Sequence, residues 1–185
     1  CVKVDVRGLQ PGRAYFYRFL AGSGPSLVGR TLTAPANAQS LSVGLVSCAN
    51  YGFGYFHAYG HLARRDDIDL VLHTGDYIYE YGADEYPRTA LMVPGRAFYP
   101  EHEIVTLEDY YQRYQLYHTD PNLLALRVAK PIAAVWDDHE ISNDASNTGA
   151  QNHQRAEGAY ADRVAAASKA YFDWMPIRRP DPRSE

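Results

Sequence analysis

The feature that most constrains this chain is a short apolar run at residues 68–72 that is followed closely by Gly75 and Asp76. Its length and branched side chains predict a buried β-strand. Ligands of open α/β sheets bind beyond the carboxyl ends of the strands, so a carboxylate at this point is well placed for chemistry. Tyr79 follows three residues later, a spacing that can bring its phenol beside Asp76. Alone, the pattern is equally typical of a loop aspartate that caps the next element.

Two further apolar runs end in polar side chains. Residues 41–47 lead to Cys48, and residues 131–136 lead to Asp137, Asp138 and His139. Apolar residues at helical spacing between 55 and 63 predict a crossover helix, which makes the first two strands a parallel pair. If all three buried strands are parallel neighbours, a thiol, carboxylates, an imidazole and a phenol converge on one edge of the sheet. Such a set suits a metal, because crowded carboxylates without a cation repel one another.

Each member of this set also has an ordinary structural interpretation. Cys48 fits a buried thiol, the aspartates fit a turn or a helix cap, and His139 fits a hydrogen-bonded structural histidine. The metal hypothesis therefore depends on the coincidence of three strand ends, not on any single residue.

Residues 1–38 have the pattern of the end of a β-domain followed by a linker. Val2, Val4 and Val6 alternate with polar residues and predict a half-buried strand, and two more short strands are predicted within residues 15–20 and 26–31. The spacing of residues 9–15 is typical of a fibronectin type III-like corner, in which the Tyr15 hydroxyl bonds back to the preceding turn. The small, polar residues 33–38 predict a linker.

The rest of the chain predicts three more helices and two loops. Residues 106–109 form a capping-box pattern, and Asp120-Pro121 is an N-cap followed by a proline at the first helical position. A last helix is predicted from about residue 156 to residue 174, where Met175-Pro176 ends it. Residues 81–105 predict a long surface loop, and residues 142–153 predict a polar one.

Composition excludes several classes of protein. The 185 residues are 46% hydrophobic, which supports a folded core, and the net charge of −4 comes from interspersed acids and bases. We therefore expect no nucleic-acid-binding surface. No apolar run approaches the roughly 18–20 residues that a transmembrane helix needs. Two cysteines set no disulfide framework, although Cys1 and Cys48 could pair.

Four motifs together resemble the PhoD-type alkaline phosphatases. They are residues 47–50 (Ser-Cys-Ala-Asn), 75–80 (Gly-Asp-Tyr-Ile-Tyr-Glu), 106–110 (Thr-Leu-Glu-Asp-Tyr) and 136–140 (Trp-Asp-Asp-His-Glu). The first strands resemble the small β-domain that precedes the catalytic domain in that family. More distantly, the second and fourth motifs are similar to the signatures of metallophosphatases at large, purple acid phosphatases included.

The resemblance implies an α/β fold with a metallophosphatase-type β-sandwich core and flanking helices. Residues 1–38 would be the end of a fibronectin type III-like β-domain, and residues 39–185 the N-terminal half of the catalytic domain. The implied activity is hydrolysis of phosphate mono- and diesters of small molecules, with Fe(III) and Ca(II) as cofactors. The implied location is periplasmic or secreted.

The resemblance also implies roles for individual residues. Cys48 and Tyr79 match the iron ligands, and Asp76 matches the carboxylate that bridges the metals. Asp138 takes a further ligand position, and Asn143 is a weaker candidate on the calcium side. His139 matches the histidine that contacts the substrate phosphate.

Nothing after Glu140 matches the second half of the family's catalytic domain. The chain is therefore expected to carry an incomplete site, and to be inactive and prone to aggregate when expressed alone. Two alternatives stay open. One is a non-catalytic calcium-binding module for a ligand or partner. The other is a purple-acid-phosphatase relative, against which the thiol of Cys48 argues.

Overall fold

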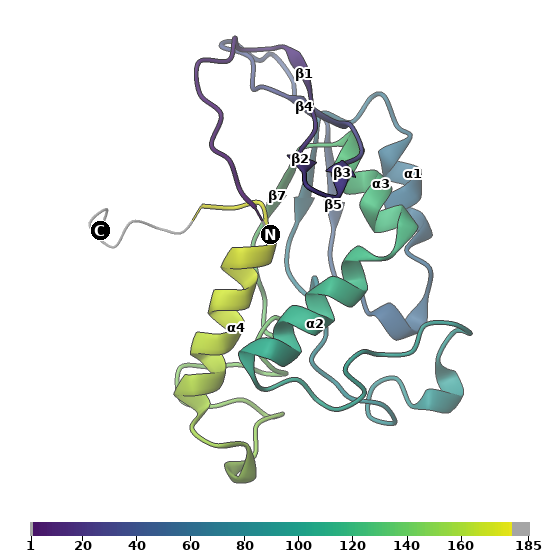
Figure 1. Cartoon of the computed structure of the whole chain (residues 1–185), viewed down its shortest axis with the longest axis vertical. Helices are drawn as coiled ribbons and strands as arrows, with labels where there is room; N and C mark the ends of the chain where they lie inside the picture. The colour runs from purple at the N-terminus through teal and green to yellow at the C-terminus, as the bar shows by residue number, and fades with distance from the viewer. Residues whose placement is uncertain (1, 179–185) are drawn as a thin grey trace.

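A three-stranded parallel sheet lies at the centre of the computed structural model, which describes residues 2–178 (Figure 1). Its strands are β5 (Val43–Val46), β6 (Leu70–His73) and β7 (Ile132–Ala134), hydrogen-bonded in the order β5-β6-β7. Both pairings are parallel. The predicted α/β class and the predicted set of parallel neighbours are therefore confirmed.

One face of this sheet is open to solvent. Leu45, Leu72 and Ala133 lie side by side across the three strands, and Leu45 is 67% exposed. On the opposite face, a side chain at Gly44 would contact Leu62 of a neighbouring helix. The prediction of fully buried strands is thus wrong for the two edge strands. The described helices cover one face only, and an apolar run does not reveal how many of its faces are covered.

Four helices flank the sheet: α1 (His57–Ala63), α2 (Leu107–His118), α3 (Pro121–Ala129) and α4 (Tyr160–Trp174). The predicted caps are confirmed. Thr106 and Asp109 form a capping box on α2, and Asp120 caps α3. The last helix begins four residues later than predicted, because η3 (Arg155–Glu157) and the left-handed Gly158 (φ +97°) precede it.

The core lies between the sheet and these helices and is rich in tyrosine. α1 packs against α3, and α2 packs against α4. Tyr110, Tyr114 and Tyr117 of α2 are completely buried. These aromatic rings supply apolar area, and where a hydroxyl finds a partner it ties the helix to another segment. Tyr117 does so by accepting the Tyr51 N–H at 3.0 Å.

The first strands form two small antiparallel pairs at the opposite end of the molecule from residues 81–105 (Figure 1). The strands are β1 (Ala14–Tyr17), β2 (Leu20–Ala21), β3 (Gly24–Pro25) and β4 (Gly29–Leu32), with β1 paired to β4 and β2 to β3. The Tyr15 hydroxyl accepts the Gln10 N–H at 2.8 Å, which confirms the predicted bond to the preceding turn. The strand predicted at residues 2–6 is wrong: Val2 is 75% exposed, and no described strand pairs with this segment.

Residues 81–105 contain only the short 3-10 helix η2 (Thr89–Leu91), as the prediction of a long loop requires. The loop is not confined to the surface, however, because Phe98 and Ile104 are buried. The buried Arg113 of α2 holds it by donating to the carbonyls of Tyr81 (2.9 Å) and Pro100 (3.0 Å). A guanidinium with several donors can thus replace regular secondary structure in fixing a loop.

A second 3-10 helix, η1 (Tyr51–Phe53), follows the first strand of the sheet. Among the described residues, no helix is both long enough and apolar enough to cross a bilayer.

Candidate metal centre at the strand ends

The carboxyl ends of the three parallel strands meet at one edge of the sheet. Directly after β5 and β6, the Cys48 N–H donates to the Gly75 carbonyl (3.2 Å), and the Ala49 N–H donates to the Asp76 carbonyl (2.9 Å). Beyond β7, the Val135 N–H donates to the His73 carbonyl at 3.0 Å. Residues that are far apart in the sequence are therefore held side by side where ligand sites of α/β sheets form.

Both strand ends turn through unusual backbone conformations. Cys48 and Asp76 each have a φ of 55°, in the left-handed region that residues other than glycine rarely adopt. Gly75 has a φ of 108° and packs so tightly that an added Cβ would lie 2.5 Å from the Asp137 Cβ. Such strain persists only where the surroundings enforce it, and it concentrates at functional sites.

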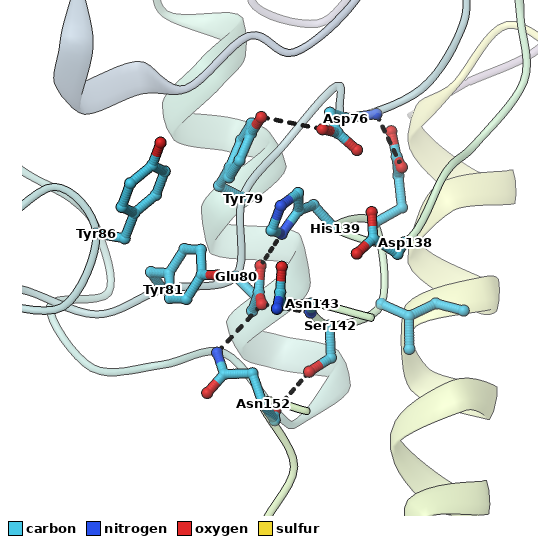
Figure 2. A network of polar contacts seen from close by, with 12 residues as sticks. Asp76, Tyr79, Glu80, Tyr81, Tyr86, Asp138, His139, Ser142, Asn143 and Asn152 are labelled. Carbon is cyan, nitrogen blue, oxygen red and sulfur yellow. Dashed lines mark hydrogen bonds and ion pairs between the residues drawn. The ribbon is translucent and has the colours of Figure 1, made fainter. Parts of the chain in front are cut away.

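Three side chains meet closely at this edge. Ligand atoms of Asp76, Asp138 and His139 all lie within 4.8 Å of one another (Figure 2). Asp76 is 7% exposed, and its Oδ1 atom is buried without a hydrogen-bond partner among the described residues. A buried carboxylate oxygen without a partner is costly, and a cation would satisfy it. The donor set therefore fits a metal ion.

Tyr79 joins the cluster through Asp76. Its hydroxyl donates to Asp76 Oδ2 at 3.0 Å, and its ring stacks on His139 with centroids 4.1 Å apart. Burial, the charge and hydrogen bond of Asp76, and the nearby Cys48 raise the pKa of Tyr79 above its usual value. The exposed, free thiol of Cys48 is the last of these contributors to the pKa of Tyr79, and it lies outside the three-residue cluster. Cys1 lies outside the described residues.

The remaining predicted ligand, Asn143, lies in the loop after the cluster. Its side-chain amide donates to Asp144 (3.3 Å) and Gln151 (2.6 Å), and its backbone N–H donates to Glu80 (2.6 Å). In the same loop, the Asp144 N–H donates to Asp138 Oδ2 at 2.6 Å. Asn143 therefore helps to shape the loop beside the site, and its role as a ligand stays a prediction.

His139 is held by a carboxylate. Its Nδ1 lies 2.8 Å from Oε2 of the fully buried Glu80. Burial by itself would lower the pKa of His139, but the hydrogen bond and charge of Glu80, together with Asp138 and Asp76, outweigh burial and raise that pKa. Burial by itself would raise the pKa of Glu80. The contact with His139 and the hydrogen bonds from Asn143 and Asn152 outweigh burial and lower that pKa. Each partner therefore favours the charged form of the other.

Sequence reasoning assigned no site role to Glu80 or Glu140, and both are important to the site. Glu140 is completely buried and accepts the N–H groups of Asp76 (3.1 Å), Tyr77 (2.6 Å) and Asp137 (2.9 Å). It thereby clamps the ends of β6 and β7 together. Burial raises its pKa to about 7, although these N–H groups act in the opposite direction. The available signal was that each of these two motifs, residues 75–80 and 136–140, ends in a glutamate.

Comparison with known proteins places this arrangement in a family. The PhoD-like phosphatase family matches residues 42–185, and the N-terminal domain of PhoD-like phosphatases matches residues 1–35. Alkaline phosphatase D of Bacillus subtilis (strain 168) is 42% identical over 180 residues, which are 96% of this chain and 30% of that protein. A solved structure described as "Structure of PhoD" has a TM-score of 0.81 at 40% identity, covering 92% of this chain and 32% of that one.

The chain thus spans about a third of the length of these two relatives. The family match nevertheless extends over most of the chain, and it includes all three strand ends and the clustered side chains. The chain therefore belongs to the PhoD-like phosphatase family.

Proposed function

We propose that this chain carries part of the catalytic centre of a metal-dependent phosphoesterase that hydrolyses phosphate mono- and diesters. The observation that carries the proposal is the cluster of Asp76, Asp138 and His139, with a buried carboxylate oxygen of Asp76 left without a partner. Family membership supports ester hydrolysis, and the name of the B. subtilis relative agrees with it.

The ligands in this proposal are Asp76 and Asp138, together with Cys48, Tyr79 and Asn143. Thiolate and phenolate donors suit Fe(III), and carboxylate and amide oxygens suit Ca(II). When bound, such ions neutralise phosphoryl oxygens and activate a water. Tyr79 must lose its proton to act as a ligand, and the present hydrogen bond to Asp76 at 3.0 Å shows where that proton lies.

His139 is the catalytic residue in this proposal rather than a metal ligand, because it lies beside the two carboxylates and offers a nitrogen that can carry a proton. With Nδ1 bonded to Glu80, its Nε2 is left for the substrate, and in the protonated ring Nε2 donates to a phosphoryl oxygen or to the leaving alcohol. An open groove of about 750 Å³ begins at Asp137 and Asp138 and extends toward Tyr160 of α4. This groove offers room for the alcohol part of a small-molecule ester.

Three finer expectations belong to the same proposal. The catalytic domain is a metallophosphatase-type β-sandwich whose N-terminal half is residues 39–185. Residues 1–38 are the end of a fibronectin type III-like domain. The protein acts in the periplasm or outside the cell. Fractionation of the source cells, with phosphatase activity followed in each fraction, tests the last of these.

The test of function compares the full-length protein with Asp76→Ala on one phosphomonoester and one phosphodiester. We expect Asp76→Ala, or complete chelation of metal, to lower kcat/KM by on the order of 100-fold or more, because the substitution removes a shared ligand. Asp66→Ala, in an exposed turn, is the matched control and should leave activity unchanged.

Elemental analysis and visible absorption accompany these assays. An Fe(III)–phenolate pair should give visible colour that is lost in Tyr79→Phe. Activity that survives full metal removal would contradict the proposal. A colourless protein that binds only calcium and has no turnover would support the non-catalytic alternative. A Cys48→Ser variant with unchanged iron content and activity would instead support the purple-acid-phosphatase alternative.

A further inference from the structure

We propose that Glu80 is a positioning residue for His139, and that Asn152 holds Glu80 in the required place. This inference rests on the proposed function, since it concerns how the catalytic histidine of that reaction is oriented. It assigns a role to an acid in the strand-end motif and to an asparagine in an irregular loop.

Glu80 is a buried carboxylate that accepts hydrogen bonds at both of its oxygens. It is completely buried, and its Oε2 contacts His139 Nδ1 at 2.8 Å. Its Oε1 accepts the Asn143 N–H at 2.6 Å and the Asn152 side-chain amide at 3.1 Å. A carboxylate can only accept, so Nδ1 must carry the hydrogen, and the second nitrogen of the ring is left for the site.

The ring of His139 also contacts two tyrosine rings. Tyr79 stacks on it with an interplanar angle of 30°, and Tyr81 lies with its ring centroid 5.5 Å from that of His139. Figure 2 shows the imidazole beside both tyrosines, with one nitrogen directed down to Glu80. Stacking restricts tilt of the ring but leaves rotation within its plane free. The hydrogen bond to Glu80 is the described contact that selects the rotation.

Asn152 connects Glu80 to a rigid element. Its carbonyl accepts the Ser142 hydroxyl and the guanidinium of Arg163 (2.5 Å), which is a buried residue of α4. Its amide is thereby aimed at Glu80 although residues 142–153 form no helix or strand. Arg163 thus fixes Asn152, Asn152 fixes Glu80, and Glu80 orients His139. Such outer contacts commonly matter 10–100-fold for activity at metal sites.

A purely structural role for Glu80, as a tie for the loop, is the rival explanation. The two roles differ in what happens when His139 is absent. A residue that acts only through His139 loses its influence with it, whereas a loop tie keeps its influence. A double-mutant cycle measures this difference directly.

The experiment uses the full-length, metal-loaded protein with a phosphodiester substrate. The variants are Glu80→Gln, His139→Ala and the two combined. We expect Glu80→Gln to lower kcat about 10–100-fold with little change in KM or in metal content. When Glu80→Gln is added to His139→Ala, we expect kcat to fall by less than about twofold relative to His139→Ala alone. Asp120→Asn, which changes another buried carboxylate paired with Arg96, is the control and should retain wild-type kcat.

Additive losses in the double variant, or loss of metal in Glu80→Gln, would overturn the proposal while leaving the proposed function intact. Absence of metal-dependent hydrolysis in the wild-type protein would overturn both, and is recognised before any variant is made. If Glu80→Gln does not fold, the same cycle is run with Asn152→Ala, whose side chain is only partly buried. We expect Asn152→Ala to lower kcat less than Glu80→Gln does, and to have no effect on kcat in the His139→Ala background.

Discussion

Gly75 is a residue at which the ends of all three strands come into contact. Its carbonyl accepts the Cys48 N–H, and its α-carbon faces Asp137 so closely that a Cβ would lie 2.6 Å from the Asp137 nitrogen. Its φ of 108° is also unfavourable for any other residue. Two separate physical reasons therefore require glycine here, one of backbone conformation and one of space.

Gly75→Ala is predicted to destabilise the protein and to disturb the site. Backbone strain alone should lower the free energy of unfolding by roughly 1 kcal/mol, and the clash with Asp137 should bring the total to about 3 kcal/mol. Gly158→Ala is the matched control, because Gly158 also has a positive φ (97°) but has nothing within 4 Å of the added Cβ. Urea unfolding measures both variants. Equal losses in the two would show that the contact with Asp137 does not matter.

At the scale of elements, β6 ends in a buried histidine that links the sheet to α1. His73 Nε2 lies 2.9 Å from the Tyr59 hydroxyl, and Nδ1 accepts the Gly75 N–H at 3.3 Å. Because Nδ1 accepts, the hydrogen of the neutral ring is on Nε2. Burial lowers the pKa of His73 to about 4. Protonation would place a charge in the core and remove the acceptor for Gly75.

This predicts a specific loss of stability in acid. The folded pKa of about 4 is below the ordinary value of 6.5, so the unfolded chain binds the proton more readily between these values. The contribution of His73 is complete above about pH 6.5, and it falls as pH drops toward 4, by roughly 3 kcal/mol in all.

The measurement is urea unfolding of wild type and His73→Gln at pH 7 and pH 5. The variant should be the less stable at pH 7 but should lose less stability on acidification. Parallel losses in the two proteins would contradict the assignment, since other acids titrate in both.

Features of the fold that depend on local chemistry could be predicted from the sequence. The helix caps at Thr106 and Asp120 were predicted from the residues that directly follow them. The strand ends were predicted from apolar runs that stop near Cys48 and Asp76. The contacts of Glu80 could not be predicted, because its partners lie 59–72 residues away, partly in a loop without periodicity. The open face of the sheet was missed for a related reason, since what covers a strand is not encoded in the strand itself.

At the scale of the whole molecule, the sheet presents apolar side chains that the described residues do not cover. Leu45 is 67% exposed, Val43 is 41% exposed, and Val135, just beyond β7, is 53% exposed. β5 and β7 are also the edges of the sheet, and such edges carry unpaired backbone groups. Contiguous apolar surface of this kind marks a contact with other protein. We therefore expect another protein segment to cover this face.

The last prediction follows from that surface. Residues 1–185 expressed alone should self-associate and show no phosphatase turnover, as measured by light scattering and by activity assay. Leu45→Lys should reduce the association, because it places a charge on the open face. Leu91→Lys, at an equally exposed leucine in η2 (68% exposed), should leave the association unchanged.

In the full-length protein, Leu45→Lys should instead lower the free energy of unfolding by about 2 kcal/mol or more, because a covered leucine is replaced by a charge. A monomeric, active 1–185, or a full-length Leu45→Lys protein as stable as wild type, would show that this face is a free surface.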